Sequence, residues 1–213
     1  MYPPDDLLPQ SALIKIPRQP RSIGMVHSIL DAGMAVIRDT GLAGMTTNRV
    51  ADRAGVSIGS LYQYFANRES ILAGIIERSQ LDIIQRMRQM HVAQLNYPLE
   101  QMLQTNMLFL LRYHEPNMTV FRRVIREAPL LADNSVLRIM ESTLMDMFRD
   151  YLLNNSHRYR LRNGHAGLYV AVNTIIFMYL KWLVQPHPAV SEAHFIDALT
   201  TQVLSCLDIT APG

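Results

Sequence analysis

Between Ser57 and Gln63 the chain places hydrogen-bonding and apolar side chains at the spacing of one short helix. A glutamine such as Gln63 can make two hydrogen bonds to adenine, and Tyr62 or Ile58 can contact a thymine methyl group. A serine that caps a helix, such as Ser57, stands beside free backbone N–H groups that can approach a phosphate. These side chains are therefore chemically able to contact a nucleic-acid duplex.

The remaining reactive residue types are not arranged for catalysis or metal binding. The seven histidines are scattered, with no pair four residues apart and no carboxylate at ligand spacing. The chain lacks P-loop and G-x-G-x-x-G motifs. The run Gly55-Val56-Ser57-Ile58-Gly59 fits G-x-S-x-G, but no strand pattern precedes it, as a catalytic serine of that motif requires. Cys206 is interpreted as a helix residue in the core, with a redox-sensing thiol as the alternative. We therefore expect neither an enzyme nor a bound metal or cofactor.

Three small or apolar residues before and within this segment have the spacing of a helix-turn-helix motif. Ala51 would let two helices approach closely, Gly55 would supply the turn, and Leu61 would anchor the second helix. An ordinary pair of antiparallel helices can show the same triplet, so the spacing alone leaves both interpretations open.

Apolar residues at spacings of three and four predict further helices along most of the chain. We expect a flexible, proline-rich basic arm over 1–20, three helices that include the possible helix-turn-helix over 21–68, and a helical domain over 69–213. Expected helices, in order, cover 21–40, 46–54, 57–65, 67–91, 99–115, 118–127, 134–154, 164–185 and 191–207. No strand is expected, because no alternating apolar pattern is long enough. The predicted fold is all-α, with about nine helices.

The run TTNRVADRAGVSIGSLYQYFANRESIL resembles the DNA-binding domain of TetR-family transcriptional regulators. The resemblance covers about residues 21–77 and its motif is long and specific; the rest of the chain matches that family only in helix count. The resemblance implies that this domain binds double-stranded operator DNA. The residues it implies for DNA contact are Thr47, Asn48, Ser57, Ile58, Gly59, Ser60, Tyr62, Gln63, Tyr64 and Arg68.

One of these positions has a second interpretation, and another departs from the usual residue of the family. Tyr64 would contact a phosphate by the family pattern, but it could instead be a packing residue. Arg68 stands where lysine is commoner in the family, and either residue supplies a positive charge for a phosphate. By contrast, Leu61 and Phe65 are expected in the core.

Positive charge is concentrated in the same part of the chain. Seven basic residues face three acidic ones from Lys15 to Arg68, a local net charge of +4, whereas the whole chain carries +2. Lys15 and Arg18 of the arm, together with the adjoining Arg21, resemble the basic arm of the family, which lies along DNA. Disorder without any DNA contact is an equal alternative for the arm.

Residues 87–147 contain eight of the thirteen methionines. Flexible methionine side chains suit an adaptable pocket for a partly apolar small molecule, and the resemblance implies an effector of that kind. An ordinary core is the other interpretation. The candidate effector-binding residues are Met102, Asn106, Phe109, Tyr113, Met140, Phe148, Tyr169, Asn173 and Phe177.

The segment 166–184 is apolar on all sides and nearly long enough to span a membrane. Asn173, Thr174 and Lys181 interrupt it, so a helix buried between its own domain and a partner subunit is favoured. We expect a homodimer through helices near 164–185 and 191–207, with no membrane contact. Asn173 would then serve the dimer interface or a polar group of the effector.

The overall prediction is a ligand-responsive transcriptional regulator, most often a repressor, released from a pseudo-palindromic operator by a small molecule. A helix-turn-helix protein that acts mainly as an adaptor through protein contacts is the alternative. The single cysteine and the acidic, proline-rich start MYPPDDLLPQ favour a bacterial cytoplasmic location over secretion.

Overall fold

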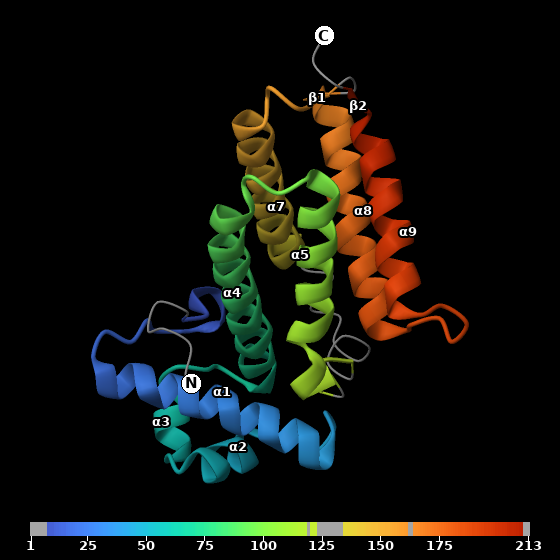
Figure 1. Ribbon diagram of the computed structural model, residues 1–213. Helices are drawn as coiled ribbons and strands as arrows, with labels where there is room; N and C mark the ends of the chain where they lie inside the picture. Colours follow the sequence, from blue (N-terminus) through green and yellow to red (C-terminus); the bar gives the residue numbers. More distant parts are fainter. Residues whose placement is uncertain (1–7, 119, 123–133, 162–163, 211–213) are drawn as a thin grey trace. The chain divides into compact units, whose positions relative to one another are not determined.

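The computed structural model describes residues 8–118, 120–122, 134–161 and 164–210. These residues are almost entirely helical (Figure 1), which confirms the expected all-α class. The helix expected at 118–127 lies largely outside the described residues. The described helices are η1 (Gln10–Ala12), α1 (Pro20–Thr40), α2 (Thr47–Ala54), α3 (Ile58–Tyr62), α4 (Arg68–Gln94), α5 (Leu99–Tyr113), η2 (Glu115–Asn117), α7 (Asn134–Asn154), α8 (Gly164–Val184) and α9 (Glu192–Leu207).

Short polar side chains start three of these helices where the sequence predicts them. The hydroxyl of Thr46 accepts a hydrogen bond from Arg49 N at the start of α2. Asn67 Oδ1 accepts one from Ser70 N, at 2.8 Å, at the start of α4. In the same way, Ser191 caps α9. These bonds satisfy backbone donors that have no partner inside the helix, which explains why the helix starts could be predicted.

The expectation that the chain has no strand is wrong for four residues. Arg160–Leu161 (β1) and Ile209–Thr210 (β2) form a short antiparallel ladder, in which Arg160 pairs with Thr210. Each strand has only two residues and its partner is about fifty positions away, so no local alternating pattern announces the pairing.

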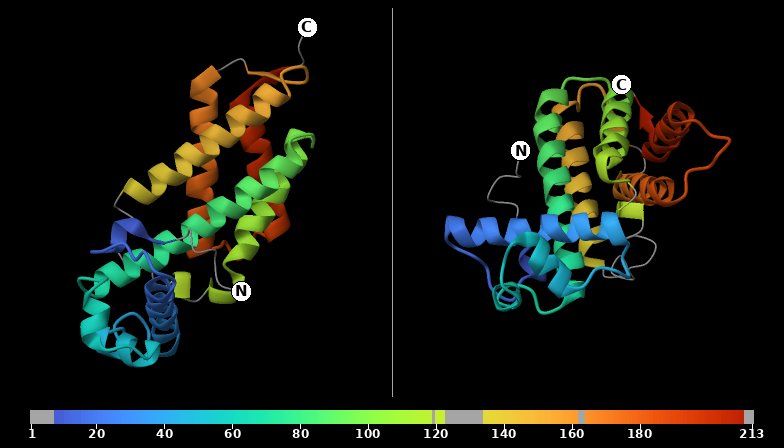
Figure 2. Two further views of the ribbon diagram at one scale, coloured as in Figure 1. Left: turned by 90° about the vertical axis from the view of Figure 1, so that its left-hand side faces the viewer. Right: turned by 90° about the horizontal axis from the view of Figure 1, so that it is seen from below.

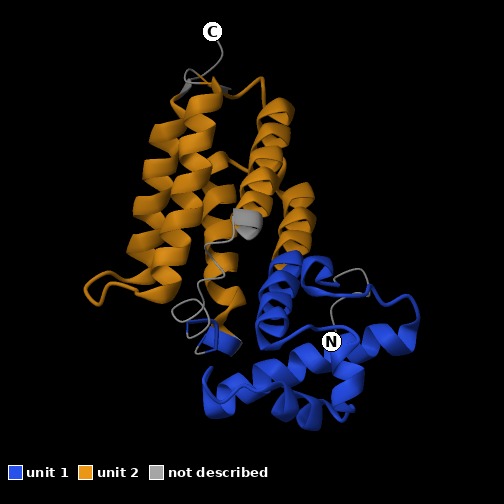
Figure 3. Ribbon diagram, turned by 180° about the vertical axis from the view of Figure 1, so that it is seen from behind, with its two compact units in different colours: residues 1–82, 117–132 blue, residues 83–116, 133–213 orange. Residues whose placement is uncertain are grey.

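The structure divides into two compact units (Figure 3). Unit 1 comprises residues 1–82 and 117–132, and unit 2 comprises 83–116 and 133–213. The sequence places the division near residue 68, whereas the division by contacts falls within α4. The first half of α4 belongs to unit 1 because Ile71 and Ile75 pack against Gly33 of α1. An ion pair of 2.7 Å between buried Arg78 and Asp31 adds a second link between the two helices.

The described part of the expected flexible arm makes specific contacts in unit 1. Leu8 is buried, and Ser11 is hydrogen-bonded to the carboxylate of Glu77. Ile14 N–H donates to the carbonyl oxygen of Tyr64 at 2.9 Å. Residues 8–19 therefore pack against the helix-turn-helix region and α4.

In unit 2, α8 packs against α9, α7 and α5, and both views of Figure 2 show α8 (orange) alongside α9 (red). Trp182 of α8 stacks on Phe195 of α9 with ring centroids 4.2 Å apart. At the end of α7, Asn155 donates to the carbonyl oxygen of Leu95 at 2.7 Å. These contacts join the helices of unit 2 around one apolar core.

Candidate nucleic-acid interface and buried cavity

The turn between α2 and α3 has the geometry that a helix-turn-helix requires. Gly55 adopts a left-handed conformation with φ of 68°, which costs glycine little and strains other residues. Val56 N–H donates to the carbonyl oxygen of Ala51, which closes the turn. The hydroxyl of Ser57 then accepts from Ser60 N at 3.0 Å and begins α3. The sequence interpretation of these residues as turn and cap is therefore confirmed.

Helix α3 presents one side to the core and the other to solvent. Leu61 and Phe65 are fully buried, as expected. Ile58 and Tyr62, one helical turn apart, are 38% and 46% exposed. The predicted residues Asn48, Ser57, Gly59 and Gln63 are also exposed, whereas Thr47, Ser60 and Arg68 are half-buried. The exposed side of α3 is therefore free to meet another molecule.

Gly59 is not required by the packing of unit 1. A Cβ atom built at this position would meet only Ser57 Oγ, at 3.9 Å. Packing within the described chain therefore gives no steric reason for a glycine here. Because glycine in a helix costs about 1 kcal/mol relative to alanine, its presence calls for another reason. A reason from outside the chain, namely the close approach of another surface, fits the open space around this residue.

Tyr62 and Thr47 connect α3 to the start of α2. The Tyr62 hydroxyl lies 3.1 Å from Thr47 Oγ1, within hydrogen-bond distance. Two residues that the resemblance implies for DNA contact are thus paired with each other and held on one surface of unit 1.

Tyr64 and Arg68 differ from the other predicted contact residues in their surroundings. The side chain of Tyr64 is only 7% exposed, and it borders a hollow lined by the arm, including Ile14 and Lys15. Arg68 donates to the carbonyl oxygen of Leu42 at 3.4 Å and to Glu69 at 3.3 Å. The packing interpretation of Tyr64 therefore has structural support, while the Arg68 guanidinium remains partly accessible.

Unit 2 contains two adjoining cavities among α4, α5, α7 and α8. Both are lined by Met87, Leu144 and Ile175, and each has about 20 Å³ of free space, close to the size of one water molecule. Four predicted effector residues line them: Met102, Asn106 and Phe148 the first cavity, and Met140 the second.

The other predicted effector residues do not line these cavities. Phe109 and Tyr113 contact each other, with ring centroids 5.9 Å apart. Tyr169 and Phe177 are 54% and 59% exposed on the outer side of α8. Asn173 donates to the carbonyl oxygen of Tyr169 within the same helix, at 3.0 Å. The structure therefore does not bring these five residues to the two cavities, and their contact with an effector stays a prediction. For the three on α8, the helix is apolar on all sides, so its periodicity does not identify the inward face.

The sequence interpretation missed several lining residues, including Met87 and His91 of α4, Met107 and Tyr179. The signal that could have found the first two is their one-turn spacing on the inner face of α4. Burial raises the pKa of Tyr179, so its phenol remains neutral. Burial also lowers the pKa of the neighbouring His114, stacked on Tyr179, to about 4. The second cavity is therefore lined without ionised groups at neutral pH.

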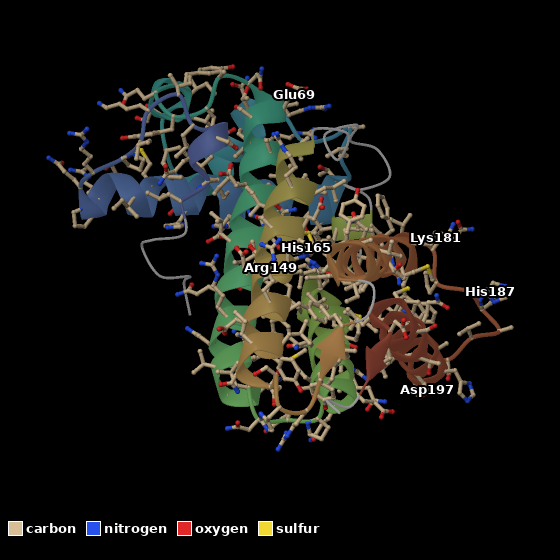
Figure 4. All side chains as sticks on the ribbon, turned by 90° about the horizontal axis from the view of Figure 1, so that it is seen from above. Glu69, Arg149, His165, Lys181, His187 and Asp197 are labelled. Carbon is tan, nitrogen blue, oxygen red and sulfur yellow. The ribbon has the colours of Figure 1, made fainter. Side chains whose placement is uncertain are left out.

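The exposed face of α8 is an apolar surface of unit 2 that is separate from the cavities. It consists of Tyr169, Val170, Phe177 and Met178, each more than 40% exposed. Figure 4 shows Lys181 of α8 and Asp197 of α9 with their side chains at the outer edge of this helix pair. By length and composition alone α8 could cross a membrane, but its other face is buried in the helix bundle.

Within the described ranges, no group of three or more His, Cys, Asp or Glu side chains could hold a metal ion. Cys206 is half-buried on α9, where Gln202 Nε2 lies 3.6 Å from its sulfur. Neither observation adds a chemical centre to the helix-turn-helix surface and the cavities.

Comparison with known sequences identifies the helix-turn-helix region. The family model for bacterial regulatory proteins of the tetR family matches residues 29–75, from α1 to α4. A curated relative, the fatty acid metabolism regulator protein of Bacillus subtilis (strain 168), is 34% identical over 61 residues. That match covers 29% of this chain and about a third (31%) of the relative's length.

Solved structures extend the similarity of the fold to most of the chain. The transcriptional regulator FadR from Bacillus subtilis, in complex with stearoyl-CoA, is 21% identical with a TM-score of 0.58, covering 85% of this chain and 96% of its own. SmeT of Stenotrophomonas maltophilia, in complex with triclosan, is 19% identical with a TM-score of 0.59, covering 89% and 93%. The helix-turn-helix region is therefore similar to that of bacterial regulatory proteins of the tetR family, and most of the chain shares the helical fold of these solved regulators.

Proposed function

We propose that this chain is a homodimeric bacterial repressor that leaves a pseudo-palindromic operator when a small-molecule effector binds unit 2. The observation that carries the proposal is the exposed side of α3. Ile58, Tyr62 and Gln63 offer apolar and hydrogen-bonding groups there, and Gly59 leaves room for close approach to a base-pair edge. A helix presented in this way suits the major groove.

The outer face of α8 supports the dimer. An exposed patch of Tyr169, Val170, Phe177 and Met178 on one helix is typical of a protein interface. Helix α9 lies beside it and exposes mostly small and polar residues, such as Ala198 and Thr201. Two copies of this helix pair would form a four-helix interface and bury the patch.

The cavities in unit 2 support effector binding. Methionines line them, and such side chains can move to admit a ligand. The relatives in complex with stearoyl-CoA and triclosan, each of which has a large apolar part, favour an effector with apolar parts.

Helix α4 is the natural link between effector and DNA in this proposal. Its residues Ile71 and Ile75 pack in unit 1, whereas Met87 and His91 line the cavity in unit 2. An effector releases DNA only if it binds better to the state that fits the operator less well. A ligand that displaces Met87 would act on the same helix that packs against the helix-turn-helix.

Selection of fragments of the source genome by the purified protein tests this proposal, followed by footprinting of the strongest fragment. We expect protection with a two-fold axis and half-site centres about one helical turn, ~34–36 Å, apart. A protected region without any dyad would contradict the dimeric mode. Retention of no fragment above background would contradict operator binding.

A further inference from the structure

Polar atoms without partners are concentrated around the cavities of unit 2. Asn106 Oδ1, His91 Nδ1 and the Tyr179 hydroxyl are buried and find no hydrogen-bond partner among the described residues. Asn106 and His91 line the first cavity, and Tyr179 lines the second. Buried polar groups are nearly always hydrogen-bonded, so three such atoms around two adjoining cavities indicate a missing partner.

The two atoms in the first cavity are hydrogen-bond acceptors. His91 Nε2 lies 2.8 Å from Asp150 Oδ2. Because a carboxylate accepts, Nε2 carries a proton, and in the uncharged form of the ring Nδ1 presents a lone pair. Asn106 donates through Nδ2 to Gln94 Oε1 at 3.0 Å, which leaves its own carbonyl oxygen free. A ligand that satisfies these atoms must bring an O–H or N–H donor.

The remaining lining argues against an anionic group at this position. Apart from His91 and Asn106, the first cavity is lined only by apolar residues: Met87, Met102, Leu103, Met107, Leu144, Met147, Phe148 and Ile175. It therefore contains no lysine or arginine. A buried carboxylate would face two acceptors without a countercharge, which is costly.

The size and position of the cavities suggest the shape of the ligand. Neither space holds more than about one water molecule as it stands, so binding requires side chains to move. Met87 belongs to both linings, and its displacement would join the two spaces. The joined space would be lined by both Asn106 and Tyr179.

We infer that the effector is an elongated, mainly apolar molecule that donates a hydrogen bond from a hydroxyl or N–H group to Asn106 Oδ1 and His91 Nδ1. This inference rests on the proposed function, since it names the chemical class of the effector. The Tyr179 hydroxyl can pair with a second polar atom of the ligand. A free fatty acid, in contrast, does not fit the first cavity.

Calorimetric titration of the wild-type dimer with 1-decanol, decyl methyl ether and decanoate tests the inference. The three ligands share a ten-carbon chain, but only the alcohol donates a hydrogen bond at neutral pH. We expect the alcohol to bind at least about tenfold more tightly than the ether or the carboxylate. Equal affinity for all three, or tighter binding of decanoate, would overturn the inference.

Two variants test whether the tighter binding of decanol depends on Asn106. Asn106→Leu removes the acceptor and should abolish the advantage of decanol over the ether. Thr200→Val is the matched control, because Thr200 is a buried residue of α9 whose unpartnered hydroxyl lies outside both cavities. It should keep the full advantage of the alcohol. An unchanged preference in a folded Asn106→Leu protein would overturn the role of Asn106, while the wild-type titrations stand independently of that variant.

Operator release, measured with the genomic fragment selected above, separates this inference from the proposed function. If decanoate binds and releases the operator, the effector class is wrong and ligand-responsive repression stands. If no ligand binds, the effector class is also wrong. A protein that binds decanol preferentially but no operator would instead support the effector class and contradict the proposed function.

Discussion

The hydroxyl of Tyr62 on α3 lies 3.1 Å from Oγ1 of Thr47 at the first residue of α2. The contact spans fifteen positions of the chain and joins the two helices on the exposed side of unit 1. It therefore holds two residues implied for DNA contact in one fixed arrangement before any DNA arrives.

The first prediction concerns this pair. Tyr62→Phe and Thr47→Val each remove one hydroxyl with little change in shape, and each should weaken operator binding, by about 1 kcal/mol. Because both remove the same contact, the double variant should lose less than the sum of the single losses. Fluorescence anisotropy with labelled operator measures this cycle. Tyr97→Phe in unit 2 is the control and should bind normally, and additive losses would show that the pair does not act together.

Gln63 and Arg68 should differ in what they recognise. Gln63→Ala should lose about 1–3 kcal/mol of discrimination at one base pair per half-site, as expected for a bidentate base contact. Titration against operators with single base-pair changes measures this loss. A uniform loss of affinity for all sequences would contradict base reading by Gln63.

Arg68→Ala should weaken binding to all duplexes alike and lower the salt dependence by about one phosphate contact per subunit. Arg88→Ala removes the same charge from an exposed position in unit 2 and should leave both quantities unchanged. Thermal unfolding of each variant accompanies the titrations, because Arg68 also bonds the Leu42 carbonyl oxygen. A change of sequence preference in Arg68→Ala would show that α3 is oriented differently on DNA.

Gly59 gives a prediction in which stability and DNA binding change in opposite directions. Gly59→Ala should raise the free energy of unfolding, by up to about 1 kcal/mol, because nothing in unit 1 opposes the added methyl group. The same methyl group should weaken operator binding by obstructing close approach. Gly24→Ala in α1, where a Cβ meets nothing within 4 Å, should stabilise without weakening DNA binding. Normal operator affinity in Gly59→Ala would refute the close approach.

The dimer depends on the exposed face of α8 in our account. Phe177→Glu should shift the sedimentation mass from two chains to one, because it places a charge in the centre of the apolar patch. Leu153→Glu changes an equally apolar residue that is 76% exposed on α7, and it should remain dimeric. Ile176→Glu would be a poor test, since Ile176 is buried within its own chain. A wild-type mass of one chain would refute the interface.

Helix ends and the helix-turn-helix were predictable because their signals are local. Thr46, Ser57 and Asn67 cap helices through bonds to residues three positions away, and Gly55 supplies a conformation that few other residues adopt. The first 68 residues carry most of these signals, and the expected elements there agree closely with α1, α2 and α3.

The cavity could be predicted only in part, because its lining comes from four helices whose relative rotation no local pattern specifies. Helix α8 is apolar all round, so Ile175 inside and Phe177 outside look alike in sequence. The sequence interpretation did not select His91, because it is a lone histidine. Its proposed hydrogen bond to an effector follows only from its position beside Asp150 and Asn106. Such positions depend on contacts between residues far apart in the chain.

Binding of the wild-type protein to its selected operator and to a scrambled duplex, over a series of salt concentrations, tests the central claim most directly. We predict that the operator is preferred by at least about 1,000-fold, and that both affinities fall steeply as salt rises. Equal affinity for the two duplexes, or binding insensitive to salt, would contradict the assignment of this protein as an operator-specific regulator.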